Sequence, residues 1–137
     1  MTSKSVAWAL RFLGVIDMLA FLAAIMPRRL MEAANLLSGL GELPPGPLVG
    51  YLARSASALY GLHGAMIFFI SFDVHRYWRL ITFLAAAALV HGLVMLGIDL
   101  HEGMPRWWTI FEPPGFAATG GIVLILQGLS NKKMEQA

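Results

Sequence analysis

Residues 79–100 read RLITFLAAAALVHGLVMLGIDL, and this stretch decides the fold class. No charged residue lies between Arg79 and Asp99, and the run is as long as the roughly 20 apolar residues that a helix needs to cross a lipid bilayer. Helices and closed barrels are the structures that satisfy every backbone hydrogen bond in lipid. The stretch therefore predicts a membrane-spanning α-helix.

Three further segments of the chain have the same character. Proline residues and clusters of charge delimit them as residues 5–26, 48–72 and 109–130. Hydrophobic residues make up 58% of the 137 residues and charged residues 13%, which is about half the charged share of a soluble domain. We therefore predict an all-α fold, an integral membrane four-helix bundle in which residues 1–137 form a single transmembrane domain.

The segment between the first two spans, residues 27–47, has a different pattern. Apolar residues recur there at helical spacing before the turn-forming residues 41–46: Leu30, Ala33, Ala34, Leu36, Leu37 and Leu40. Such spacing is typical of an amphipathic helix that lies along a surface. We predict a short interfacial helix between the first and second spans.

Lysine and arginine residues indicate how the spans are oriented. The side shared by both termini carries Lys4, Arg76, Arg79, Lys132 and Lys133. The opposite side carries Arg28, Arg29 and Arg106. Because basic loops favour the cytoplasm, we expect a multi-pass protein of a bacterial inner membrane with both termini cytoplasmic.

Several kinds of chemistry find no support in the sequence. The chain has no cysteine, which removes disulfides, thiolate metal sites and cysteine nucleophiles. It lacks the glycine-rich phosphate loop, the Gly-x-Ser-x-Gly elbow and the His-Glu-x-x-His zinc motif. The net charge of +2 comes from basic residues near predicted helix ends, so we expect no nucleic-acid partner. We predict a non-enzymatic protein with no catalytic residue and no metal site.

Small residues form a stripe along three of the predicted helices. The stripe comprises Gly14, Asp17, Ala20 and Ala24 on the first helix, Gly50, Arg54, Ser57, Gly61 and Gly64 on the second, and Ala85, Ala88, Gly92, Leu96 and Asp99 on the third. Small side chains let helix backbones approach closely in lipid. The stripes predict one compact bundle and leave the neighbour of the fourth helix open.

Asp17, Arg54 and Asp99 are charged residues that lie within the apolar segments. At about 1.5 Å per residue, Arg54 is about 10 Å inside Pro47 and Asp99 about 9 Å inside Pro105, so we predict an Arg54–Asp99 ion pair with Asp17 within reach. One interpretation is a buried charge network that fixes helix register. The other is a polar cavity, bordered by Tyr51 and Glu112, in which Arg54 binds a carboxylate or phosphate group.

Two histidines, His63 and His91, each lie in mid-helix directly before a glycine. Equal depths on antiparallel neighbouring helices would place both imidazoles on the same side of their interface. Such a pair could hold a b-type haem. The alternatives are a quinone or sterol-like head group bound by one histidine, or a hydrogen bond to a neighbouring helix.

Residues 54–61, RSASALYG, follow a first helix that ends at Pro27 and an amphipathic stretch. This outline of the first half of the chain resembles small bacterial four-helix membrane proteins of the DoxX type. The resemblance implies a four-helix fold, and it carries no catalytic residues. Members of that group often accompany redox or membrane-complex proteins, so the resemblance also implies partners of that kind.

Short predicted loops leave little room for an independent soluble site. We therefore expect an accessory or scaffolding subunit of a larger membrane complex, surrounded by lipids and bound to partner subunits or to its own copies. One alternative is a module that binds haem, quinone or lipid through His63 and His91 or through the Arg54 cluster. Another is a minimal transporter that works as an oligomer.

Overall fold

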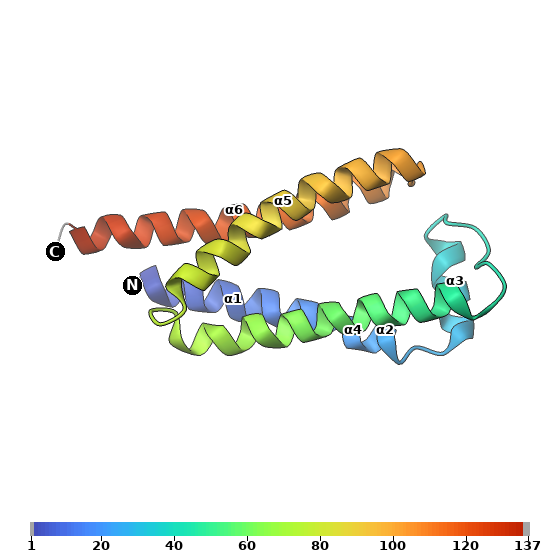
Figure 1. The fold of residues 1–137 in the computed structure, drawn as a ribbon, viewed down its shortest axis with the longest axis horizontal. Coiled ribbons are helices and arrows are strands. Elements are labelled where there is room, and N and C mark those ends of the chain that lie inside the picture. The colour runs from blue at the N-terminus through green and yellow to red at the C-terminus, as the bar shows by residue number, and fades with distance from the viewer. Residues whose placement is uncertain (1, 136–137) are drawn as a thin grey trace. The chain divides into compact units, whose positions relative to one another are not determined.

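The computed structural model describes residues 2–135, and every regular element in this range is helical (Figure 1). The elements are α1 (Thr2–Met18), α2 (Ala20–Ala24), α3 (Arg28–Leu37), α4 (Pro47–Ile70), the 3-10 helix η1 (Ser71–Asp73), α5 (Trp78–Glu102) and α6 (Arg106–Glu135). The prediction of an all-α fold is confirmed.

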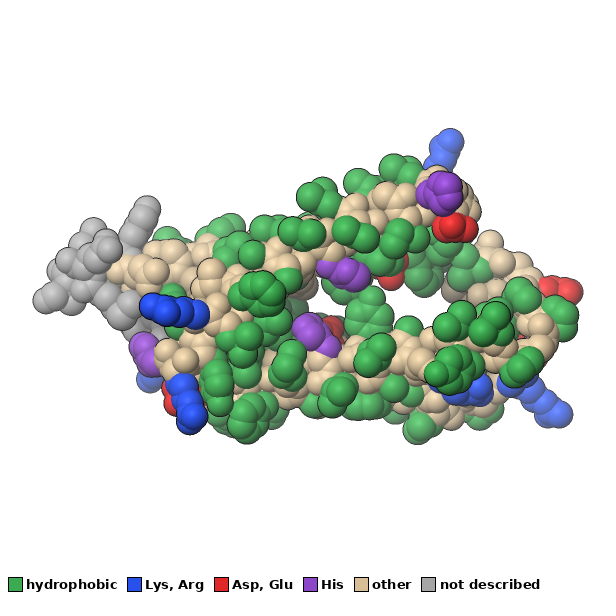
Figure 2. Space-filling view, viewed as in Figure 1, with side chains coloured by type: hydrophobic (Ala, Val, Ile, Leu, Met, Phe, Trp, Pro, Cys, Tyr) green, Lys and Arg blue, Asp and Glu red, His purple; other side chains and the backbone are tan. Residues whose placement is uncertain are grey.

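Four helical stretches are long and apolar enough to cross a membrane. They run over Lys4–Ala24, Pro47–Asp73, Trp78–Glu102 and Arg106–Asn131, within a few residues of the spans predicted from the sequence. Most of their large apolar side chains are exposed, among them Phe12, Leu62 and Phe83. On the face shown in Figure 2, hydrophobic side chains cover the long helices and Lys and Arg side chains gather near the helix ends.

The helix expected between the first two spans is present as α3. Its turn-forming continuation contains three glycines with positive φ, Gly39, Gly41 and Gly46, a backbone conformation that side chains with a Cβ rarely adopt. The arginine at the start of α3 binds this loop, because Arg28 donates hydrogen bonds to the carbonyls of Pro44 and Gly46. The loop therefore folds back on the polar side of α3.

The chain divides into two compact units. Unit 1 comprises residues 1–12 and 69–137, and unit 2 comprises residues 13–68. The single transmembrane domain expected from the sequence stays a prediction.

In unit 2, the second part of α1 packs against α4 through two glycines. A Cβ atom built on Gly14 would lie 2.8 Å from the carbonyl oxygen of Gly64, and one built on Gly64 would lie 2.6 Å from the carbonyl oxygen of Gly14. Seven residues beyond Gly14, on α2, the ring of Phe21 covers Gly61. The small-residue stripes predicted on these two helices therefore bring their backbones into contact, as such residues do in membrane helix pairs.

In unit 1, α5 and α6 form an antiparallel hairpin (Figure 1). Gly92 of α5 lies against the backbone of α6 at Pro113 and Ala117, and Gly120 of α6 lies against the carbonyl oxygen of Ala85. A polar contact adds to this packing, because the Thr82 hydroxyl donates to the buried Gln127 side chain at 3.0 Å. The neighbour of the fourth helix, which the sequence left open, is therefore α5.

The turn between α5 and α6 follows a known helix-ending pattern. Gly103 has a φ of +68°, and the backbone N–H of Met104 donates to the carbonyl of Asp99 at 3.0 Å. This hydrogen bond between residues five positions apart is typical of the Schellman motif, in which it satisfies a carbonyl at the helix end. The chain then enters α6 directly after Pro105, so the hairpin turns within three residues.

Candidate functional site: a carboxylate–imidazole pair on α1 and α4

Asp17 of α1 and His63 of α4 form a polar pair in unit 2. Oδ2 of Asp17 lies 3.0 Å from Nδ1 of His63. The glycine contact explains why the two side chains meet: Asp17 lies about one turn beyond Gly14 on α1, and His63 directly precedes Gly64 on α4. The close approach of the two backbones leaves room for a short carboxylate and a flat ring side by side.

This pair is half-exposed on an otherwise apolar surface. The side chains of His63 and Asp17 are 46% and 31% exposed. One turn to either side of His63 on α4, the side chains of Leu59 and Met66 are also exposed. The pair is therefore accessible to a molecule that approaches along the apolar faces of the two helices.

The hydrogen bond determines what the histidine can do. An ionised carboxylate only accepts hydrogen bonds. In this pair, Nδ1 of His63 therefore carries a hydrogen and donates the hydrogen bond to Oδ2 of Asp17. The second ring nitrogen, Nε2, then presents a lone pair, and it has no hydrogen-bond partner within residues 2–135. A carboxylate that holds an imidazole in this way fixes the tautomer and the orientation of the ring, as it does for metal-bound histidines.

Arg54 lies elsewhere in unit 2. Its guanidinium is partly buried and donates a hydrogen bond from Nη2 to the carbonyl oxygen of Met26 at 2.9 Å. Met26 follows the end of α2, where helix carbonyls lack partners and a positive charge is favourable. Tyr51, predicted at the border of a cavity with Arg54, is exposed on α4.

The other predicted polar residues belong to unit 1. Glu112 accepts a hydrogen bond from the indole nitrogen of Trp108 one turn earlier on α6. The ring of His91 packs edge-on against Phe116, with 4.7 Å between the ring centroids. Because His91 and His63 lie in different units, as do Asp99 and Arg54, the shared haem site and the Arg54–Asp99 ion pair both stay predictions.

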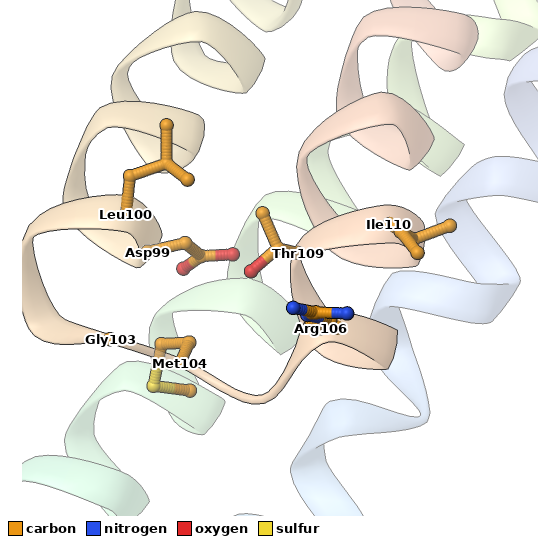
Figure 3. Close-up of a pocket in the computed structure, with 7 residues that line it drawn as sticks. All are labelled: Asp99, Leu100, Gly103, Met104, Arg106, Thr109 and Ile110. Carbon is orange, nitrogen blue, oxygen red and sulfur yellow. The ribbon is translucent and has the colours of Figure 1, made fainter.

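Asp99 lines a pocket at the turned end of the α5–α6 hairpin (Figure 3). The residue is only 2% exposed, and Oδ2 of its carboxylate has no hydrogen-bond partner in the part of the chain that the structure describes. The pocket has a volume of about 240 Å³ and is lined by Asp99, Leu100, Gly103, Met104, Arg106, Thr109 and Ile110. It is the second polar site of the chain.

Two features were not found from the sequence. The first is the Asp17–His63 pair, because the sequence pattern groups Asp17 with Arg54 and His63 with His91. The nearby glycines Gly14 and Gly64 are the pattern that could have predicted it. The second is Arg11 on α1, which lies over the rings of Trp8 and Phe72 and donates to Ser71 at 3.4 Å. Arg11 is therefore a charge in an apolar helix that aromatic and hydroxyl groups stabilise.

Comparison with known proteins adds no assignment, because the chain matches no protein-family model, no curated protein and no solved structure. Within residues 2–135, no three His, Asp or Glu side chains are grouped so that they could hold a metal ion. The function therefore has to be inferred from the two polar sites.

Proposed function

We propose that the chain is a multi-pass membrane protein that binds a quinol-type head group at the Asp17–His63 pair. The single observation that supports this function is the 3.0 Å hydrogen bond that orients His63 through Nδ1 and leaves Nε2 as an acceptor. The four long apolar helices support the membrane location, with both termini on the cytoplasmic side.

The chemistry of a quinol fits this acceptor. A quinol carries a phenolic hydroxyl, which donates a hydrogen bond, on a flat ring with an apolar tail. Nε2 of His63 accepts from the hydroxyl, and Asp17 stabilises the positive charge of the ring if the proton moves to it. The tail then lies along the exposed apolar side chains of α4, such as Leu59 and Met66.

The proposed location in lipid favours a ligand at the Asp17–His63 pair, because polar atoms without partners are costly there. A charged or polar group that faces acyl chains costs several kcal/mol, at about 2.5–3.5 kcal/mol for an aspartate at the helix centre on insertion scales. The Asp17–His63 hydrogen bond offsets part of this cost, and a bound hydroxyl offsets more by occupying Nε2. The pair is therefore suited to a ligand that arrives through the membrane.

Binding of a decyl-substituted ubiquinol to the detergent-purified protein, measured by calorimetry, tests this proposal. We expect Asp17→Asn and His63→Gln each to weaken binding about tenfold or more, the usual cost of losing a charge-assisted hydrogen bond. The matched control is His75→Gln, an exposed histidine in the turn between α4 and α5, which should bind as the unmodified protein does.

Two results would contradict the proposal. One is affinity that neither Asp17→Asn nor His63→Gln lowers. The other is a Soret absorption band that His63→Gln removes, because Nε2 would then be a haem ligand and not a quinol acceptor.

A second candidate function is an accessory or scaffolding subunit of a larger membrane complex, with protein partners or copies of the same chain. It is supported by the short connections that follow α4 and α5, which are too small for an independent soluble site. The resemblance to proteins of the DoxX type points the same way. Gentle detergent purification followed by mass analysis of co-purifying proteins tests it.

A further inference from the structure

The pocket at the turned end of the α5–α6 hairpin contains an unusual carboxylate. Asp99 is almost fully buried, yet Oδ2 of its side chain accepts no hydrogen bond from the residues that the structure describes. A buried polar atom without a partner costs about 1–3 kcal/mol, and more when it is charged. A group from outside this part of the chain would remove that cost.

A hydroxyl group adjoins Asp99 on the facing helix. The carboxylate and the Thr109 hydroxyl point toward one another from α5 and α6 (Figure 3). Asp99 is the one acid among the residues that line the pocket, so a ligand that fits its carboxylate is a cation with N–H groups.

The shape and lining of the pocket favour an organic cation over a bare metal ion. Its volume of about 240 Å³ is several times the roughly 30 Å³ that one water takes up in liquid. Three of its lining side chains are apolar: Leu100, Met104 and Ile110. An ammonium group attached to a carbon chain fits both the carboxylate and these side chains.

Arg106 adds a second charge of opposite sign to the lining. Its exposed guanidinium makes no ion pair or hydrogen bond with any residue between 2 and 135. Guanidinium groups bind phosphate with two parallel hydrogen bonds. A ligand that carries an ammonium and a phosphate on neighbouring atoms would use both Asp99 and Arg106.

We propose that this pocket binds the phosphoethanolamine head group of a phospholipid, with the ammonium on Asp99 and the phosphate on Arg106. Leu100 and Ile110 are both more than half exposed next to the pocket, where acyl chains can lie against them. The choice of a phospholipid as the ligand rests on the membrane location proposed above. The site is separate from the Asp17–His63 pair, so it does not depend on quinol binding.

The test is lipid retention measured by native mass spectrometry of the purified full-length protein. The protein is mixed with equal amounts of phosphatidylethanolamine, phosphatidylcholine and phosphatidylglycerol. Phosphatidylcholine has no N–H, and phosphatidylglycerol has a phosphate without an amine, so each lacks one part of the proposed contact. The variants are Asp99→Asn and Arg106→Gln, and the matched control is Glu102→Gln, an exposed acid one turn from Asp99 on α5.

We expect the unmodified protein and Glu102→Gln to retain phosphatidylethanolamine at least about tenfold over phosphatidylglycerol, the preference expected from one charge-assisted hydrogen bond. Asp99→Asn should remove this preference, and Arg106→Gln should weaken retention of all three lipids. If soluble phosphoethanolamine displaces phosphatidylethanolamine from the protein, the same two contacts are supported, with the free molecule as a ligand.

Equal retention of the three lipids by the unmodified protein would overturn the proposal, as would a preference that survives Asp99→Asn. Arg106→Gln provides an independent readout if Asp99→Asn does not fold, because Arg106 is exposed. Loss of quinol binding in Asp17 variants with an intact lipid preference would separate the two sites.

Discussion

At the scale of single residues, glycine positions decide which polar side chains meet. Gly14 and Gly64 bring α1 and α4 so close that an added Cβ would overlap the opposite backbone. Asp17 and His63 are the polar residues nearest this contact, and they form a hydrogen bond. The partner of a polar side chain in this helix pair therefore depends on where the two backbones approach most closely, and not only on its depth along the helix.

Gly64→Ala tests this dependence. A Cβ at position 64 would lie 2.6 Å from Gly14 O and 2.7 Å from the Cβ of Asp17, so the helices must separate. We expect a loss of about 1–3 kcal/mol in the free energy of unfolding, the usual cost of overpacking a core. Thermal unfolding in detergent, followed by circular dichroism, measures it as a lower Tm.

Gly97→Ala is the matched control on α5. Nothing lies within 4 Å of a Cβ built on Gly97, and alanine favours a helix over glycine by up to about 1 kcal/mol. This variant should therefore be as stable as the unmodified protein or slightly more so. Equal destabilisation by Gly64→Ala and Gly97→Ala would show that the α1–α4 contact is not tight.

At the scale of elements, α3 has its apolar side outward. Its polar side is engaged within unit 2, because Arg28 binds Glu32 and two loop carbonyls and Asn35 donates to the carbonyl of Gly41. The opposite side exposes Leu30, Ala33, Ala34 and Leu37. A surface helix in water normally has the reverse arrangement. The exposed face therefore suits the boundary region of a bilayer.

Single cysteines test this placement of α3, since the chain has none of its own. In liposomes, a fluorescent label at Leu37→Cys, whose native side chain is 89% exposed, should be quenched by brominated lipid and shielded from iodide in water. A label at Glu42→Cys, in the exposed loop beyond α3, is the control and should show the opposite behaviour. Iodide quenching of equal strength at both positions would contradict an interfacial α3.

At the scale of the whole molecule, the sequence predicted the long helices well and their partners poorly. Length and apolarity are local properties, so all four helices end within a few residues of the predicted bounds. The partner of a given side chain depends instead on which backbones touch. The stripe ending at Asp99 predicted only that its helix joins a compact bundle, and the structure shows that its Gly92 packs on α6.

The site shows the same limit. Depth along the helix grouped Asp17 with Arg54 and His63 with His91, but the structure brings Asp17 to His63 and Arg54 to the Met26 carbonyl. The pocket beside Asp99 is lined by residues of α5, of α6 and of the three-residue turn between them. Such features combine distant residues, and no single-helix pattern contains them.

An even number of crossings leads to a prediction about the chain ends. Four crossings would place both termini on one side of the membrane, and we expect that side to be the cytoplasm because Lys and Arg are in excess there. Tags at the N- and C-terminus should both resist protease added outside spheroplasts and be cut after lysis. A tag cut before lysis at either end would contradict this orientation.

The turn at Gly103 separates two tasks at position 99. The backbone carbonyl of Asp99 closes the turn, while its side chain takes no part in that bond. Any amino acid can supply the carbonyl, so asparagine at position 99 can keep this backbone bond while it removes the negative charge from the pocket. The turn itself therefore places no demand on the side chain at position 99, and that side chain can vary independently of the backbone bond.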